Sequence, residues 1–121
     1  MKQANLALRF LMEIAAITTF GIWGYSLSGS GYRIILAVLF SLAFAVLWGV
    51  FAVKDDPSRS GKTVVSTPGA IRLLLELILF GSASCMLFDL GYTIPGWILC
   101  GTVILHYIIS LDRIAWLLKQ K

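Results

Sequence analysis

Four long apolar runs constrain the fold of this chain more than any other feature of its sequence. They extend over residues 6–27, 34–53, 70–90 and 94–111. Each run is close to the ~20 residues that an α-helix needs to cross the hydrocarbon core of a bilayer. Charged residues make up only 13% of the 121 residues, whereas a soluble domain carries about 25%. The sequence therefore predicts an all-α, four-transmembrane-helix bundle in a single domain over residues 1–121, with the lipid bilayer as its main partner.

Two short turns and one longer loop separate these runs. Residues 28–31 read Ser-Gly-Ser-Gly and residues 91–93 read Gly-Tyr-Thr, so both short turns fall where small or polar residues interrupt the apolar pattern. Residues 54–69 form the only sizeable polar segment. This arrangement predicts two helical hairpins in up-down-up-down order, joined by the loop over residues 54–69.

The basic residues predict how such a bundle is oriented. Nine of the ten lie at the termini or around the long loop, and only Arg33 lies at the other end of the spans. By the positive-inside rule, both termini and the long loop are then cytoplasmic, in a multi-pass protein of the plasma membrane. The formal net charge of +4 thereby follows from topology and gives no reason to expect nucleic-acid binding. A cleaved signal peptide is the alternative for the first run, but Glu13 interrupts its apolar region.

An internal repeat relates the two predicted hairpins. Residues 8–14 match residues 71–77 position by position, with Arg9 and Glu13 four apart in the first copy and Arg72 and Glu76 four apart in the second. Residues at this spacing lie on one face of a helix, so each arginine is expected to neutralise its own glutamate. Because both copies begin a hairpin on the cytoplasmic side, the repeat is parallel rather than inverted.

These pairs and His106 are expected to lie at the same depth, in the inner leaflet. Ionisable residues inside a membrane face the bundle interior and pair with one another, so Arg9, Glu13, Arg72, Glu76 and His106 form a candidate binding or proton-handling site. The alternative is that they are polar residues that hold the helices together. Both interpretations remain open from the sequence.

Two further pairs lie near the outer end. Arg33 and Asp89 could form an exposed ion pair between the hairpins, which contributes little to stability. Cys85 and Cys100 lie at matching depths, where a disulfide is conceivable, although two small residues in a helix interface are the favoured interpretation. No spacing of Cys and His residues indicates a metal site, no cofactor is implied, and no nucleophile constellation favours an enzyme.

The long loop contains the most specific motif. Residues 56–59, Asp-Pro-Ser-Arg, fit a type I turn with Asp first and Pro second. Residues 56–61 and 67–69, together with the two Arg and Glu pairs, resemble the YrdB family over essentially the whole chain. The resemblance implies a small bacterial four-helix integral membrane protein, whose loop and Arg and Glu pairs are hallmarks of the family. It implies no activity.

Two classes of function follow. In the first, the cytoplasmic cluster and the loop residues Asp56 and Arg59 bind an anionic lipid headgroup or a partner protein, because arginine suits anionic groups. In the second, the protein is a proton-coupled small-molecule carrier that acts as a homo-oligomer. Intramembrane carboxylates and small size motivate this alternative, although a glutamate already paired with arginine is a poor acceptor for a cation.

Overall fold

Helices make up most of the chain in a computed structural model that describes residues 3–59 and 61–121. The elements in chain order are α1 (Gln3–Ser26), α2 (Arg33–Val50), β1 (Phe51–Ala52), β2 (Val65–Ser66), α3 (Gly69–Asp89), α4 (Thr93–Ile109) and α5 (Leu111–Leu118). The prediction of an all-α protein is thus confirmed. Lys2 and Ser60, one in the basic set and the other in the loop motif, lie outside the described residues.

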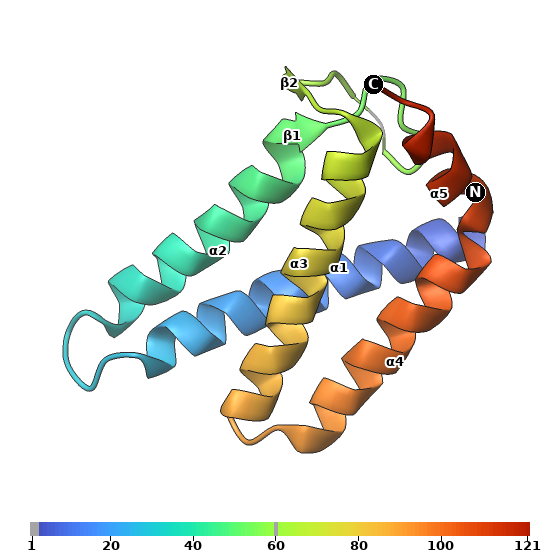
Figure 1. Ribbon diagram of the computed structural model, residues 1–121. Coiled ribbons are helices and arrows are strands. Elements are labelled where there is room, and N and C mark those ends of the chain that lie inside the picture. The colour runs from blue at the N-terminus through green and yellow to red at the C-terminus, as the bar shows by residue number, and fades with distance from the viewer. Residues whose placement is uncertain (1–2, 60) are drawn as a thin grey trace.

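The two predicted hairpins are formed by α1 with α2 and by α3 with α4 (Figure 1). In the first hairpin the helices approach closely at Gly24, where an added Cβ would lie 2.6 Å from the Leu36 carbonyl oxygen. In the second, Gly91 supplies the positive φ of 86° that the turn requires. Both termini, β1 and β2 lie at one end of the bundle, and the two short turns lie at the other end.

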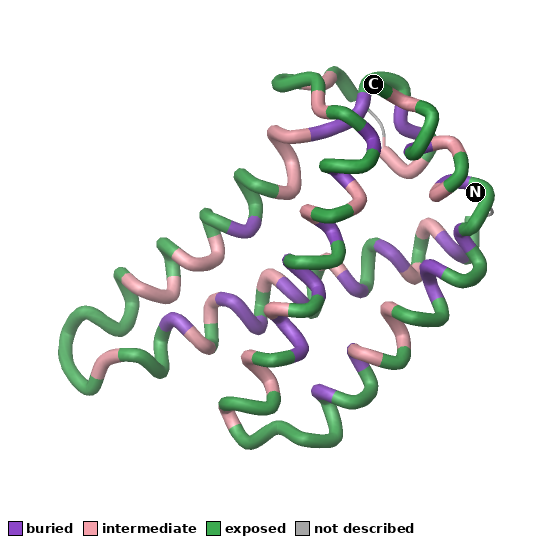
Figure 2. The backbone as a smooth tube through the Cα atoms, viewed as in Figure 1, coloured by how far each residue is buried: buried purple, intermediate pink, exposed green. Residues whose placement is uncertain are grey.

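The core lies between the hairpins, and the outside of the molecule is apolar as well. Most of the buried residues belong to α1, α3 and α4, whereas most of α2 is exposed (Figure 2). The buried core cluster consists of Met12, Ala16, Phe20, Phe44, Leu79, Phe80, Ala83, Leu99 and Tyr107. Large exposed apolar residues cover the outer face of α2, namely Ile34, Ile35, Val38, Leu39, Leu42, Val46 and Leu47. A soluble monomer rarely exposes so continuous an apolar surface.

Several helices are suited to a bilayer. Within the described part of the chain, α1, α2 and α3 are each long and apolar enough to cross a membrane, and α4 with α5 passes the same test only if this bent pair is one span. The observed bounds of α1, α3 and α4 differ from the predicted spans by at most a few residues.

The structure corrects the predicted ends of two helices. The second was expected to reach Val53, but α2 ends at Val50, and the chain enters a parallel pair in which Phe51 lies opposite Val65. The fourth was expected to end at Leu111 without a further helix. Instead the chain bends by 70° at Ser110 and continues as α5. This bend turns Arg113, which is 1% exposed, back into the interior.

Candidate binding site

Glu76 lies at the centre of the polar residues and is completely buried. Arg9 and Arg113 each donate to both of its carboxylate oxygens, at 2.9–3.2 Å and 2.8–3.0 Å. Arg72 Nε donates to Oε2 at 2.8 Å, and the Tyr107 hydroxyl donates to Oε1 at 2.6 Å. Side chains from α1, α3, α4 and α5 thus all donate hydrogen bonds to one carboxylate. Glu76 therefore connects these four helices.

The two Arg and Glu pairs are not equivalent in this arrangement. Arg72 and Glu76 pair as predicted. By contrast, Arg9 Nε lies 3.6 Å from Glu13 Oε1, while both terminal nitrogens of Arg9 turn to Glu76. The predicted pair of Arg9 with Glu13 is therefore present, but the shorter contacts of Arg9 are with Glu76. The physical reason is burial, because the Glu13 side chain is 27% exposed and Glu76 has no solvent to replace its protein donors.

Trp48 holds Glu13 in place and belongs to the site, although it was not among the predicted site residues. Its indole Nε1 donates to Glu13 Oε1 at 2.8 Å. The guanidinium groups of Arg9 and Arg72 lie over its ring, 4.8 and 4.6 Å from the centroid. Cations at this distance are attracted to the face of an indole. Trp48 belongs to α2, whereas Arg9 belongs to α1 and Arg72 to α3. Their contact could therefore not be recognised before the fold was known.

Arg72 also explains where α2 ends. Its Nη1 donates to the carbonyl oxygens of Trp48 and Phe51, each at 2.6 Å. The last carbonyl groups of a helix have no partner within the helix, and a basic side chain satisfies them. One guanidinium thereby connects the end of α2 to the central carboxylate of α3.

The loop is held to the same cluster through Arg113, which was not among the predicted site residues. Arg113 Nε and Nη2 donate to the two oxygens of Asp56 at 2.9 and 2.6 Å. The predicted turn is confirmed, since the Arg59 N–H donates to the Asp56 carbonyl oxygen at 3.3 Å. Arg113 shares a polar stripe with His106 in the sequence, which was the available signal, but only the bend at Ser110 directs it to Glu76.

Asp56 is the carboxylate in the loop that binds Arg113, and its pKa is lower than the ordinary value of an aspartate. Burial acts to raise the pKa of the Asp56 carboxyl, but the hydrogen bonds and charge of Arg113 and the donors of Ser58 outweigh burial and hold the pKa below its ordinary value. A carboxylate with a lowered pKa contributes stability that is present above the pKa of the unfolded chain, near 3.8, and is lost as the pH falls through the folded pKa.

We therefore expect Asp56→Asn to unfold at a lower temperature than wild type at neutral pH, with a difference that shrinks between about pH 5 and pH 2. The measurement is thermal unfolding against pH in one detergent. Asp112→Asn is the matched control, because Asp112 is exposed and forms no ion pair in the described residues. A difference that stays constant with pH would contradict the assignment.

His106 is completely buried beside this cluster, in a chain of hydrogen bonds. Its Nε2 lies 3.4 Å from Arg9 Nη1, and its Nδ1 lies 2.7 Å from Asn5 Oδ1. Guanidinium groups only donate, so Nε2 must accept and Nδ1 must carry the proton, which makes the ring neutral. Asn5 Nδ2 then donates to Ser110 Oγ at 2.7 Å. The network links the start of α1 to the bend after α4.

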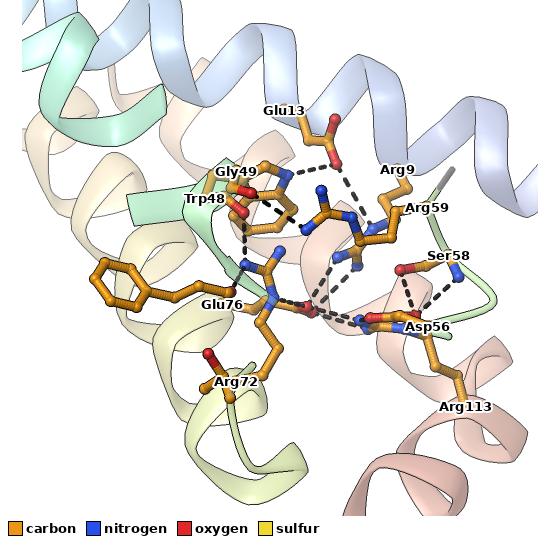
Figure 3. Close-up of polar contacts among 12 residues, drawn as sticks. Arg9, Glu13, Trp48, Gly49, Asp56, Ser58, Arg59, Arg72, Glu76 and Arg113 are labelled. Atoms are coloured by element: carbon orange, nitrogen blue, oxygen red, sulfur yellow. Dashed lines mark hydrogen bonds and ion pairs between the residues drawn. The ribbon is translucent and has the colours of Figure 1, made fainter. Parts of the chain in front are cut away.

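An open groove, lined mostly by α1, the end of α2 and the loop, lies beside the buried cluster. Its volume is about 560 Å³, and its lining includes Arg9, Glu13, Trp48, Arg59 and Arg72. Figure 3 shows the side chains of Glu13, Trp48 and Arg59 together beside the contacts of Glu76. Apolar walls are contributed by Leu6 and Phe10, and Phe10 is 60% exposed. We call this feature the Arg59 groove.

Arg59 differs from the other arginines of the site. Its Nη1 donates to the Gly49 carbonyl oxygen at 3.3 Å, and no carboxylate within the described ranges lies in ion-pair distance of it. The structure thus brings all five predicted cluster residues and both predicted loop residues to one end of the bundle. Only Arg59 among the four arginines of the site has no carboxylate partner among residues 3–59 and 61–121.

The predicted pair at the outer end is not formed. Asp89 accepts a hydrogen bond from Trp23 Nε1 at 2.9 Å, and Arg33 Nε donates to the Ser28 carbonyl oxygen at 2.7 Å. Each side chain finds a partner nearby, so the expected ion pair between the hairpins is wrong. Cys85 and Cys100 are free thiols.

Comparisons with known proteins agree with the resemblance drawn from the loop and the Arg and Glu pairs. The family model described as protein of unknown function (DUF2568) matches residues 7–104. Uncharacterized protein YrdB of Bacillus subtilis (strain 168) is 43% identical over 122 residues, which cover 99% of this chain and 98% of the relative. No solved structure matches the chain.

Proposed function

The chain belongs to the DUF2568 family, and on that premise we propose that it is a multi-pass protein of the bacterial plasma membrane whose Arg59 groove binds an anionic lipid headgroup. The observation that carries the proposal is the position of Arg59, a guanidinium without a carboxylate partner that lines an open groove with apolar walls.

The proposed orientation places the groove at the cytoplasmic surface of the membrane. Eight basic residues of the described ranges belong to the end with the loop and the C-terminus, against Arg33 at the other end. The positive-inside rule makes the first end cytoplasmic. The cytoplasmic leaflet is rich in anionic lipids, and a basic residue near its surface gains about 1 kcal/mol from their potential. Lipid headgroups of the cytoplasmic leaflet can therefore reach the Arg59 groove.

Charge complementarity supports an anion as the occupant. Arg9, Arg72 and Arg113 are matched in number by three carboxylates, Glu13, Asp56 and Glu76. Arg59 adds one positive charge that has no ion-pair partner among residues 3–59 and 61–121. A guanidinium binds phosphate oxygens in a bidentate manner, and the exposed ring of Phe10 offers an apolar surface for the start of an acyl chain.

Binding is favoured over proton-coupled transport by the partners of the buried ionisable groups. Glu76 accepts hydrogen bonds from four side chains. A proton that binds to this carboxylate would have to displace one of these four hydrogen bonds. His106 is held between a donor and an acceptor as a neutral ring. A carrier needs a group that exchanges its partner during the cycle, and these contacts favour a static network.

We expect Arg59→Gln to weaken binding of anionic phospholipid about 5- to 10-fold, because it removes one charged donor from the groove. The measurement is binding of phosphatidylglycerol to the purified full chain in phosphatidylcholine nanodiscs. Arg33→Gln makes the same change at the opposite end and is expected to bind like wild type. Equal binding by wild type and Arg59→Gln would overturn the proposal, as would equal losses in the two variants.

A further inference from the structure

A second polar group of the Arg59 groove has spare capacity for a ligand. Resting on the function proposed above, we propose that Glu13 accepts a hydrogen bond from the bound headgroup, so that the groove selects phosphodiester headgroups carrying an O–H or N–H donor. The groove then presents a cation for the phosphate and an acceptor for the group attached to it, both lining one cavity of about 560 Å³.

The contacts of Glu13 leave one of its two oxygens available. Both of its contacts with the described residues, from Trp48 Nε1 and from Arg9 Nε, are made to Oε1. A carboxylate can accept about four hydrogen bonds over its two oxygens. The side chain is 27% exposed and lines the groove. Oε2 is therefore free to accept from a ligand without breaking a contact of the protein.

The orientation of Glu13 is set before a ligand arrives. Trp48 donates to it from a ring that lies beneath two guanidinium groups and packs against Phe44 and Phe80, at centroid distances of 5.6 and 5.0 Å. The carbonyl group of Trp48 is bound by Arg72. An acceptor held by such a rigid neighbour loses little conformational entropy when it binds a donor.

A purely electrostatic role for Glu13 makes a different prediction. If Glu13 only balanced the charge of Arg9, its removal would strengthen the binding of every anionic headgroup alike. As a hydrogen-bond acceptor, Glu13 instead distinguishes headgroups of equal charge by whether they carry a donor. Two pairs of phospholipids provide that comparison. Phosphatidylglycerol and phosphatidylmethanol are both anionic, but only the first carries hydroxyl groups, and phosphatidylethanolamine carries the N–H donors that phosphatidylcholine lacks.

The experiment measures binding of all four lipids to the full chain in micelles of one uncharged detergent. Wild type is expected to prefer the donor-bearing lipid of at least one pair by about tenfold, the ratio that corresponds to one hydrogen bond to a charged group. Preference within the first pair identifies the donor as hydroxyl, and preference within the second identifies it as ammonium. Glu13→Ala is expected to abolish the preference while still binding phosphatidylmethanol through Arg59.

Two further variants separate selection from folding. Glu13→Gln keeps the size and a carbonyl acceptor but removes the charge, so it is expected to retain part of a hydroxyl preference and lose an ammonium preference. Asp55→Asn changes an exposed carboxylate outside the groove and is expected to keep the wild-type ratios. Equal affinity of wild type for both members of both pairs overturns the role of Glu13, and the proposed function survives if Arg59→Gln still weakens binding. Insensitivity of all lipids to Arg59→Gln overturns both.

Discussion

Replacing Glu76 by glutamine is expected to cost about 3–5 kcal/mol of folding free energy, the loss typical of removing one partner of a buried ion pair. The change leaves Arg9, Arg72 and Arg113 buried around a neutral amide. Glutamine also carries an NH2 group where four side chains now donate, so at least one donor loses its acceptor. The expected result is therefore a sharply lower unfolding midpoint, or a chain that does not accumulate in folded form.

The measurement is unfolding of the purified protein in a single mild detergent, by heat or by denaturant. Glu13→Gln is the matched control, because it makes the same chemical change in the other pair of Arg and Glu residues four apart. Its side chain is 27% exposed and its contact with Arg9 is 3.6 Å long, so we expect a loss of at most about 1 kcal/mol. Equal losses in the two variants would contradict the central role assigned to Glu76.

A double variant tests whether the loss arises from uncompensated charge. Arg113 donates to both oxygens of Glu76, so Glu76→Gln combined with Arg113→Gln is expected to be less destabilised than the sum of the two single variants. Groups in one network typically show interaction free energies of about 0.5–3 kcal/mol. Strict additivity would mean that the two side chains contribute independently.

Substituting Gly69 by alanine is the second change with a large expected effect. Gly69 begins α3 and is buried, and its N–H donates to the Gln120 carbonyl oxygen at 3.1 Å. An added Cβ would overlap the carbonyl oxygen of Leu117, near the end of α5. Because both clashing groups belong to helices, no rotamer change relieves the overlap. We expect α5 to move away from α3, at a cost above the 1–3 kcal/mol that is typical of overpacking.

The displacement of α5 would also withdraw Arg113 from Asp56 and Glu76. Gly69→Ala should therefore expose the loop, which limited proteolysis of the full chain can detect between α2 and α3. Gly81→Ala is the control in the same helix, since a Cβ at Gly81 meets nothing within 4 Å. This control is expected to leave stability unchanged or to raise it by up to about 1 kcal/mol through helix propensity. Resistance of Gly69→Ala to both unfolding and proteolysis would show that α5 does not dock as described.

Hydrophobic periodicity and turn chemistry predicted the helices well, for a clear physical reason. The apolar runs are interrupted at residues 28–31 and 91–93, and the helices end beside those residues. Such signals are local, because glycine, serine and proline affect the backbone where they stand. The turn at Asp56 was predicted on the same basis. The end of α2 was placed three residues late, because the contacts of Arg72 with its last turn join segments more than 20 residues apart.

The sequence by itself determined the all-α class, the two hairpins and the choice of Arg9, Glu13, Arg72 and Glu76 as residues to examine. Each Arg and Glu pair has a spacing of four residues, which places both side chains on one face of a single helix. This pattern can be recognised without knowing which other segments lie nearby. Only the tertiary structure decided that Arg9 binds Glu76 as well as Glu13, and that Arg113, Tyr107 and Trp48 join the cluster. A buried charge takes the donors that several helices bring to it, and no pattern within one helix encodes which neighbours those are.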